Sequence, residues 1–489
     1  MKFNIDEILT ATSGYIFYKN SNYNPNKEYE ISGITTMINS PEDTIYLPNK
    51  LKVNIGVVDS FTSIEHVLQN GVRCFFFDEI RFGEKNYNDY LLNLISKKSD
   101  KIDLIIMVSD TMLALRGLAE YTRYKKLPKN VKYAAITGSI GKTSTTEMLY
   151  YILSVRYKAF RGEPTCNIRY RIMHKFLEAP SDVEWMIFEC SGQLKGYLAD
   201  FSQLLMPDIA IVTKIANENL GEYRTFQNLA KEKSTIISSM SKNSVAVLND
   251  QEVLHNASED YICKKIFAKE GLYQLLKTDN FGSEFIYKNE RYHLPVVGVH
   301  QIDNAIKAIE LTKAIGFTYE EIKQGLSNFV SVGDRWVVDK FENNVEFVTD
   351  CPNNPSYDTL VSGINTFMNI YKNSNYKRII ISRITALGDF EYQTYIKIAK
   401  YISKLDIQEL ICVGVELEPL VEYIKNNSSI KVTCFAAPKL IDDDAEFIKY
   451  LVKTMYFEQA TLIKAQGEDG KLYFGNTKDV LKKYLKLAQ

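Results

Sequence analysis

The sequence predicts an α/β protein of three domains, in which the central domain has a mainly parallel sheet and the C-terminal domain is Rossmann-like. Two observations predict this fold. The chain has 489 residues, a length that suggests about three domains. From about residue 129 onward, short apolar runs typical of strands alternate with longer amphipathic runs typical of helices. Such alternation is characteristic of parallel sheets whose faces are covered by helices.

The domain boundaries are predicted from breaks in this pattern. Residues 1–128 hold short strand-like runs, such as "GVRCFFFDEI", and a helix-like run, "TMLALRGLAEYTRY", which ends before Pro128. Residues 129–331 carry alternating runs that include "VEWMIFEC", "PDIAIVTKI" and "NSVAVLND". Residues 332–489 alternate again, from "VEFVTD" to "ATLIKAQ", and Gly333 in "SVGDRW" marks the expected hinge.

A phosphate-binding loop is predicted in "AAITGSIGKTSTTEML", where a strand-like run meets a glycine turn and then a helix. Gly138 and Gly141 allow a tight turn whose backbone N–H groups converge on an anion, and Lys142 adds charge for the β- and γ-phosphates. Thr143 offers a hydroxyl to Mg²⁺. The first glycine of the usual P-loop pattern is replaced by Ile136, and the alternative is a chance GKT in an ordinary turn. The nucleotide-binding residues predicted here are Gly138, Ser139, Gly141, Lys142, Thr143 and Ser144.

The composition excludes several classes of function. The net charge of −1 gives no reason to expect nucleic acid or an anionic membrane surface as a partner. No apolar run is long enough to span a membrane, so no membrane insertion is expected. The start, "MKFNIDEILTATSGY", lacks a signal peptide, which favours a cytoplasmic protein. The seven cysteines show no C-x-x-C spacing, so neither a zinc site nor a disulfide framework is expected.

Six further motifs follow the loop in a fixed order. They are "MIFECSG", "PDIAIVTKI", "FQNLAKEKSTII", "GVHQIDNAIKAIELTKAIGFTYEEIKQGL", "GDRW" and "VTDCPNNPSYDTL". With these motifs the chain resembles the Mur ligases over roughly residues 105–470. The resemblance implies that ATP phosphorylates a carboxylate, that an amine attacks the acyl phosphate, and that an amide and phosphate leave. It implies ATP and Mg²⁺ as cofactors, a small-molecule acid and amine as substrates, and substrate-binding, ATP-binding and ligase domains in that order.

The resemblance assigns catalytic roles to Lys142, Glu189 and Lys233. Glu189 ends a predicted strand and corresponds to the family's Mg²⁺ ligand; the alternative is an exposed strand-end acid. Lys233 corresponds to a lysine that CO₂ converts to a carbamate, which binds a second Mg²⁺. Lys231 lies two positions away and faces another side of the helix. The alternative is that Lys233 is an ordinary surface lysine.

Nucleotide contacts are also implied at four later positions. His300 and Asn304 are four residues apart, hence on one helical face, and the family pattern touches the adenine; a capping pair is the alternative. Arg335 corresponds to a phosphate contact and Asp350 to a ribose contact. Lys464 ends a late strand and corresponds to a substrate-orienting lysine, with a solvated lysine as the alternative.

Two positions depart from the family near the predicted metal site. Lys214 replaces an asparagine, and Asn219 occupies the position of a metal-binding histidine. The asparagine still offers a carbonyl oxygen to Mg²⁺, so Asn219 is kept as a metal-ligand candidate. Lys214 is a candidate for holding phosphate in place of some of the metal's charge.

The region expected to read the acid substrate departs further. Met37 and Asn39 in "GITTMIN" stand where the family's UDP-binding segment has Asp and Arg. Arg169 and Tyr170 fill positions where relatives carry asparagines. Arg169 and the nearby Arg171 suit an anionic substrate, although a basic helix start is the alternative. These changes leave the identity of the acid open.

The leading prediction is therefore an ATP- and Mg²⁺-dependent carboxylate–amine ligase acting on a cell-envelope precursor or a related sugar or peptide acid. One alternative is the family member that adds D-Ala-D-Ala to a UDP-muramoyl tripeptide. Another is a nucleotide-binding module without catalysis, which Lys214 and Asn219 suggest and which the retained Lys142, Glu189 and Lys233 argue against. A P-loop kinase or GTPase is disfavoured because no N-K-x-D motif stands at the expected place.

Overall fold

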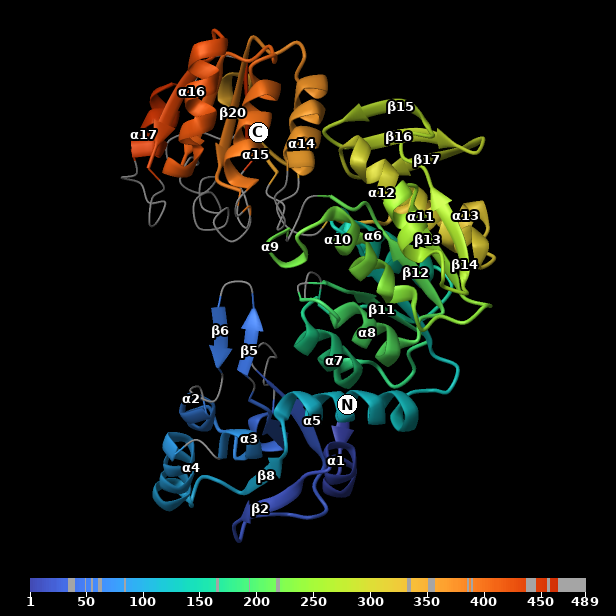
Figure 1. Cartoon of the computed structure of the whole chain (residues 1–489), viewed down its shortest axis with the longest axis vertical. Coiled ribbons are helices and arrows are strands. Elements are labelled where there is room, and N and C mark those ends of the chain that lie inside the picture. Colours follow the sequence, from blue (N-terminus) through green and yellow to red (C-terminus); the bar gives the residue numbers. More distant parts are fainter. Residues whose placement is uncertain are drawn as a thin grey trace. The chain divides into compact units, whose positions relative to one another are not determined.

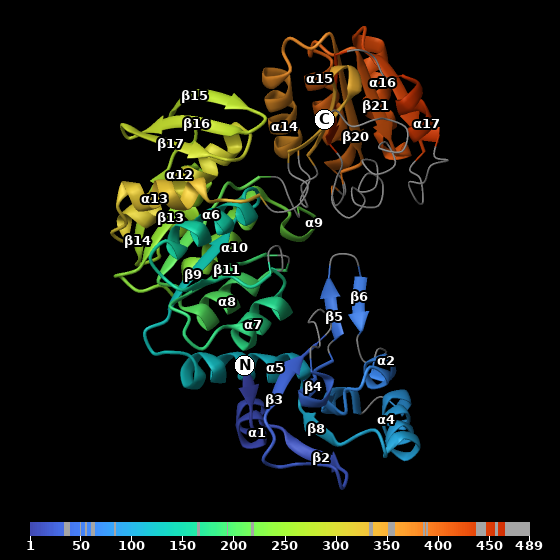
Figure 2. The same ribbon diagram turned by 180° about the vertical axis from the view of Figure 1, so that it is seen from behind.

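The chain divides into two compact units, each described separately. One consists of residues 1–134 and 157–193, and the other of residues 135–156 and 194–489. Figures 1 and 2 show the computed structural model from opposite sides. It describes residues 1–33, 40–48, 50–53, 56–59, 64–82, 85–163, 167–192, 194–216, 220–331, 336–350, 357–384, 387, 390–436, 446–454 and 458–464. Within these ranges no helix is long and apolar enough to cross a membrane.

The first unit contains a six-stranded mixed sheet. Its strand order is β1(Lys2–Phe3)-β3(Tyr29–Ser32)-β4(Thr44–Tyr46)-β7(Cys74–Asp78)-β8(Leu104–Val108)-β2(Tyr15–Lys19). The strands from β3 to β8 run parallel, whereas the edge strands β1 and β2 are antiparallel to their neighbours. β7 and β8 are buried throughout, as expected of parallel strands covered on both faces. The helices of this part are α1(Ile5–Thr12), α2(Ile64–Gln69), α3(Glu79–Phe82), α4(Lys85–Lys98) and α5(Thr111–Tyr121). β5(Lys50–Val53) and β6(Gly56–Asp59) pair in antiparallel orientation.

The first unit also takes in a later stretch of the chain. α5 continues as one π-helical turn, Thr122–Lys126, and ends before Pro128, as predicted. Here β10(Ala159–Phe160) pairs in parallel with β11(Trp185–Glu189), and α7(Arg169–Glu178) packs against α5. β9(Lys132–Thr137) starts in this unit, where the Lys132 N–H donates to the Glu184 carbonyl at 2.9 Å. It continues into the second unit.

The second unit begins with a sheet that carries the predicted loop. Strands β9, β12(Ile209–Val212), β13(Val245–Asn249) and β14(Lys264–Ala268) are neighbours in that order, and β12, β13 and β14 are parallel. Three strands form a separate antiparallel sheet, which the sequence did not predict: β15(Gln274–Asp279), β16(Gly282–Tyr287) and β17(Glu290–Leu294). The helices are α6(Lys142–Ser154), α8(Tyr197–Leu205), α9(Leu220–Tyr223), α10(Phe226–Ser234), α11(Glu252–Ser258), α12(Val299–Ala314) and α13(Tyr319–Ser327).

A second six-stranded sheet follows. Its order is β18(Val337–Phe341)-β19(Val345–Thr349)-β23(Gln459–Lys464)-β20(Tyr376–Ser382)-β21(Glu409–Val413)-β22(Lys431–Phe435), parallel except for β18. Alternate residues point to opposite faces: Ile379 and Ile381 join one core cluster and Ile380 joins the other. The helices are α14(Tyr357–Ile370), α15(Glu391–Ile402), α16(Glu418–Asn427) and α17(Glu446–Lys453). The predicted α/β class with mainly parallel sheets is confirmed.

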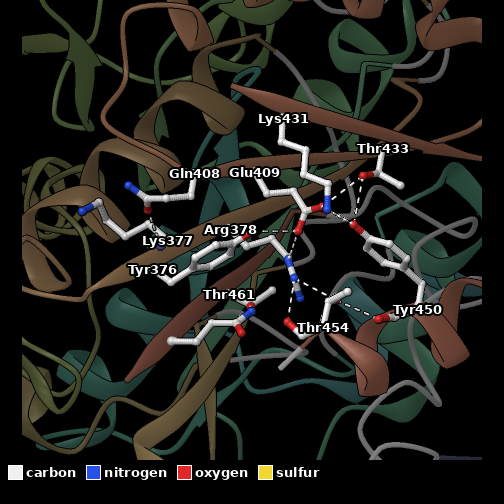
Figure 3. Close-up of polar contacts among 11 residues, drawn as sticks. Tyr376, Lys377, Arg378, Gln408, Glu409, Lys431, Thr433, Tyr450, Thr454 and Thr461 are labelled. Carbon is white, nitrogen blue, oxygen red and sulfur yellow. Dashed lines mark hydrogen bonds and ion pairs between the residues drawn. The ribbon is translucent and has the colours of Figure 1, made fainter. Parts of the chain in front are cut away.

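A buried ionic network closes the amino end of this sheet (Figure 3). Arg378 Nε lies 2.6 Å from Glu409 Oε2, and both side chains are fully buried. Arg378 also donates to the backbone oxygen and hydroxyl of Thr454. Glu409 accepts from the hydroxyls of Thr433 and Tyr450. Burial acts to raise the pKa of Glu409, but Tyr450 and Arg378 outweigh it and lower that pKa. The network is structural, because ligands of such sheets bind at the opposite, carboxyl end.

Candidate active site

The predicted phosphate-binding loop forms a turn that requires glycine at two positions. Gly138 has φ +135° and Gly141 has φ +88°, backbone conformations that other residues rarely adopt. A Cβ at Gly138 would lie 2.0 Å from Thr213 Oγ1, and one at Gly141 would lie 2.2 Å from Asn304 Oδ1. Thr213, which follows β12, and Asn304 of α12 therefore leave no room for a side chain at either glycine.

Polar contacts hold the loop from both sides. Lys142 begins α6, and its Nζ donates to the carbonyls of Gly138 at 2.8 Å and Ser139 at 2.9 Å. The N–H groups of Ser139 and Ile140 donate to the Lys214 carbonyl at 2.9 and 3.2 Å. The side chains of Ser139, Lys142, Thr143 and Ser144 are all buried. Lys142 is thus curled over the turn beside the helix N-terminus, the position that phosphate binding needs.

The two predicted adenine contacts have different neighbours. Asn304 of α12 is buried against Gly141, and its amide lies 3.5 Å from Gln301 Oε1. His300, one turn earlier, has its Nδ1 at 2.8 Å from the Ser362 hydroxyl of α14. The alternative of a capping pair between His300 and Asn304 finds no support in these contacts. Asn304 therefore packs from α12 against the phosphate-binding loop, and His300 links α12 to α14.

Lys233 lies on the buried side of α10. The helix starts at the N-cap Thr225, whose hydroxyl accepts from the Asn228 N–H. Lys233 is 0% exposed, whereas Lys231 is exposed. Its burial favours the functional interpretation of Lys233 over that of an ordinary surface lysine.

Glu189 ends β11, in the first unit, and is buried. The Asn167 side-chain amide donates to its Oε1 at 2.7 Å. The alternative of an exposed strand-end acid is thereby excluded, and the carboxylate is held in one orientation.

Asp350 and Lys464 meet at the carboxyl edge of the C-terminal sheet. They follow the paired residues Thr349 and Ile463 of β19 and β23, and their side chains form a buried ion pair. Gly363 of α14 passes directly over the pair. Lys464 is therefore not a solvated lysine.

The two arginines near the start of α7 differ in their surroundings. Arg171 is buried and paired with Glu163 and Glu178, each at 3.1 Å. Its charge is already balanced within the fold. Arg169 is half-buried, and its role toward an anionic substrate stays a prediction.

Several predicted residues fall outside the described ranges. These are Met37, Asn39, Asn219 and Arg335. Among the residues that are described, no three or more His, Cys, Asp and Glu side chains gather as a metal-binding cluster.

One polar cluster near the loop was missed by the sequence analysis. Glu270 follows β14 and lies 3.0 Å from Lys214 Nζ and 3.6 Å from Lys307 Nζ. The Asn249 amide, at the end of β13, donates to Glu270 at 2.8 Å. No motif marks Glu270, which stands in the ordinary-looking turn "AKEG".

Comparisons with known proteins agree with this geometry. Residues 136–312 match the Mur ligase middle domain. A UDP-N-acetylmuramoyl-tripeptide–D-alanyl-D-alanine ligase of Borreliella burgdorferi is 26% identical over 379 residues, which is 73% of this chain and 76% of that protein.

The similar solved structures include MurF from two bacteria. MurF of Acinetobacter baumannii has a TM-score of 0.76 and 18% identity, with 99% of each chain covered. MurF of Thermotoga maritima, in complex with ADP, has a TM-score of 0.70 and 17% identity, covering 93% of this chain and 98% of that one. At these low identities the structural similarity shows the fold alone.

Proposed function

The chain is similar to the Mur ligases and, among them, to MurF, and on that premise we propose that it is an ATP-dependent amide-forming ligase. The observation that carries the proposal is the loop at Gly138–Ser144. It has the turn, the buried lysine and the helix N-terminus that phosphate binding needs, and it lies within the matched middle domain.

In the proposed reaction, a carboxylate oxygen of the acid attacks the γ-phosphorus of ATP and ADP leaves. The amine nitrogen then attacks the acyl carbon, phosphate leaves, and the amine's proton passes to solvent. The phosphates are proposed to bind at the N-terminus of α6 and to Lys142, because the N–H groups of Ser139 and Ile140 already donate to the Lys214 carbonyl. Asn304 and His300 are proposed to contact the adenine, Asp350 the ribose, and Arg335 a phosphate.

The oxygen donors of this chain suit Mg²⁺. Thr143 supplies a hydroxyl at the loop and Glu189 a buried carboxylate oriented by Asn167, and Mg²⁺ prefers such ligands together with phosphate oxygens. Lys233 as a carbamate and Asn219 would complete the set. When bound, Mg²⁺ neutralises phosphate charge that the cationic side chains leave unbalanced.

The acid is proposed to be a cell-envelope precursor or a related sugar or peptide acid. The narrower proposal, addition of D-Ala-D-Ala to a UDP-muramoyl tripeptide, rests on the name of the curated relatives. Arg169 favours an anionic substrate of either kind. Met37 and Asn39 depart from the UDP-binding pattern, which is why the broader class is preferred.

Phosphate release from ATP in the presence of paired acids and amines tests the proposal. The panel includes UDP-muramoyl tripeptide with D-Ala-D-Ala, other sugar and peptide acids, and controls lacking either the acid or the amine. We expect release that needs both substrates and is absent in Lys142→Ala. Nucleotide binding without such release from any pair would instead favour a non-catalytic binding module.

A further inference from the structure

Lys214 occupies a place where it can act on both the loop and a bound nucleotide. It lies just after β12, and its carbonyl accepts hydrogen bonds from the N–H groups of Ser139 and Ile140. These bonds hold the Lys214 backbone directly beside the phosphate-binding turn. This is the carboxyl edge of a parallel sheet, where ligands of such folds bind.

The Lys214 side chain is oriented by Glu270 and still open to solvent. Its Nζ lies 3.0 Å from Glu270 Oε2, and the side chain is 37% exposed. The other oxygen of Glu270 is held by Asn249 at 2.8 Å and faces Lys307. Glu270 is therefore fixed from the side away from Lys214, and it restrains the direction in which the Lys214 ammonium points.

Lys307, the second lysine near Glu270, is buried and lies on the other side of that carboxylate from Lys214. Lys307 is 1% exposed, and its Nζ also donates to the Asp303 carbonyl at 3.1 Å. Burial lowers the pKa of Lys307, and the pull of Glu270 opposes that shift. For Lys214, burial acts in the same direction, but Glu270, together with Asp358 and Asp303, outweighs it and raises the pKa. Lys214 is thus a half-buried lysine that stays charged at neutral pH, whereas Lys307 is fully buried.

We propose that Lys214 is a positioning residue for the nucleotide phosphates. Its carbonyl fixes the turn, and its ammonium, restrained by Glu270, adds a fixed positive charge on the phosphate side of the site. The inference rests on the proposed nucleotide binding and is independent of which acid and amine are joined. It also gives a physical role to the lysine that replaces the family's asparagine.

Binding of ATP, ADP and adenosine to the full chain tests this role by calorimetry in EDTA, so that no metal ion contributes. The variants are Lys214→Asn, which restores the family residue, and Lys214→Arg, which keeps the charge. Lys288→Asn is the matched control, because Lys288 forms a comparable pair with Glu310 at 2.7 Å on a hairpin turn. Lys214→Gln repeats the charge loss with a longer side chain if the asparagine lowers the melting temperature.

We expect Lys214→Asn to weaken ATP and ADP binding by about tenfold, as for a partly exposed charged contact. Adenosine binding should change less than twofold, and Lys214→Arg should regain most of the ATP affinity. If Lys214→Asn lost equal affinity for ATP and adenosine, or bound ATP as tightly as Lys288→Asn does, the role inferred for Lys214 would be overturned. The proposed function would not be affected by that result. If the unaltered protein bound neither ATP nor ADP, the proposed function would fail together with that role.

Discussion

Asp350 and Lys464 form a buried ion pair between two neighbouring parallel strands, β19 and β23, and Gly363 of α14 lies over it. Asp350 and Lys464 directly follow the paired residues Thr349 and Ile463, so the strand pairing brings the two side chains close together. The Asp350 N–H is also bonded to the Ile463 carbonyl at 2.9 Å. Both groups are thus placed by the backbone of the sheet.

The close approach of Gly363 to this ion pair predicts that an alanine at position 363 lowers the free energy of unfolding rather than raising it. A Cβ at Gly363 would lie 2.7 Å from Asp350 Oδ2 and 2.8 Å from Lys464 Nζ. Gly363→Ala should push the ends of these two side chains aside and lower the free energy of unfolding by about 1–3 kcal/mol, measured in urea. Helix propensity alone would raise it by about 1 kcal/mol. Asn369→Ala, at an exposed position of α14, is the control, and a stabilised Gly363→Ala would refute the argument.

The crowding at Gly141 predicts a loss of nucleotide binding in Gly141→Ala. Its φ of +88° and the nearby Asn304 amide both oppose a side chain. Gly196 is a matched control, because it also precedes a helix with φ +86° but has nothing within 4 Å of its added Cβ. Both alanines should cost similar backbone strain. ATP affinity should fall by more than about tenfold only in Gly141→Ala, because only there must the loop move. Equal affinities would contradict this.

Lys233 and Lys231 offer a paired test of the carbamate proposal. Lys233→Ala should remove most of the amide-forming turnover, and small carboxylic acids should restore part of it by filling the gap with an oxygen ligand. Lys231→Ala should leave turnover unchanged, because that side chain is exposed. Turnover is measured as phosphate release. Similar rates in the two variants would remove Lys233 from the site.

His174 predicts acid sensitivity of the fold. The ring is fully buried in α7, and burial, assisted by Arg171, lowers its pKa to about 3; Glu178 lies 3.9 Å away. Between the folded pKa and the unfolded value near 6.5 the unfolded chain binds one more proton, so stability falls as the pH drops. By pH 5 this group should cost about 2 kcal/mol relative to neutral pH.

His174→Phe should remove that part of the pH dependence. Urea unfolding of the variant and the parent at pH 7.5 and pH 5 measures it. His66→Phe serves as the control because His66 is exposed on α2. Parent and His174→Phe curves that shift equally between the two pH values would show that His174 is not the acid-sensitive group.

Local patterns predicted much of the fold. The apolar run before Gly138 and the amphipathic run after it became β9 and α6, because such periodicities determine secondary structure locally. The sheet β15–β16–β17 was not predicted, because its short strands stand within a stretch already assigned to alternation.

Fewer of the contacts in the candidate site could be predicted from the sequence. Lys233 was chosen over Lys231 by its correspondence to the family's lysine, and helical geometry added only that the two face different sides. The burial of Lys233 agrees with that choice. The contact of Glu270 with Lys214 joins residues 56 positions apart, and it depends on the order of strands in the sheet. The approach of Asn304 to Gly141 is equally non-local. No spacing within a single motif encodes such contacts.

The first unit is built from two separate segments of the chain, and this constrains the order in which the protein can fold during synthesis. Residues 135–156 leave the ribosome before residues 157–193, yet they belong to the other unit. In the finished fold the Met1 nitrogen bonds to the Leu177 carbonyl, and α5 packs on α7. A nascent chain that ends at residue 134 therefore exposes the α5 surface that α7 will cover, a surface open to aggregation or chaperone capture. The first unit can complete its fold only after residue 193 has emerged from the ribosome. Residues 135–156, which carry the phosphate-binding loop, can pack only later, because the rest of their unit, residues 194–489, has not yet been translated.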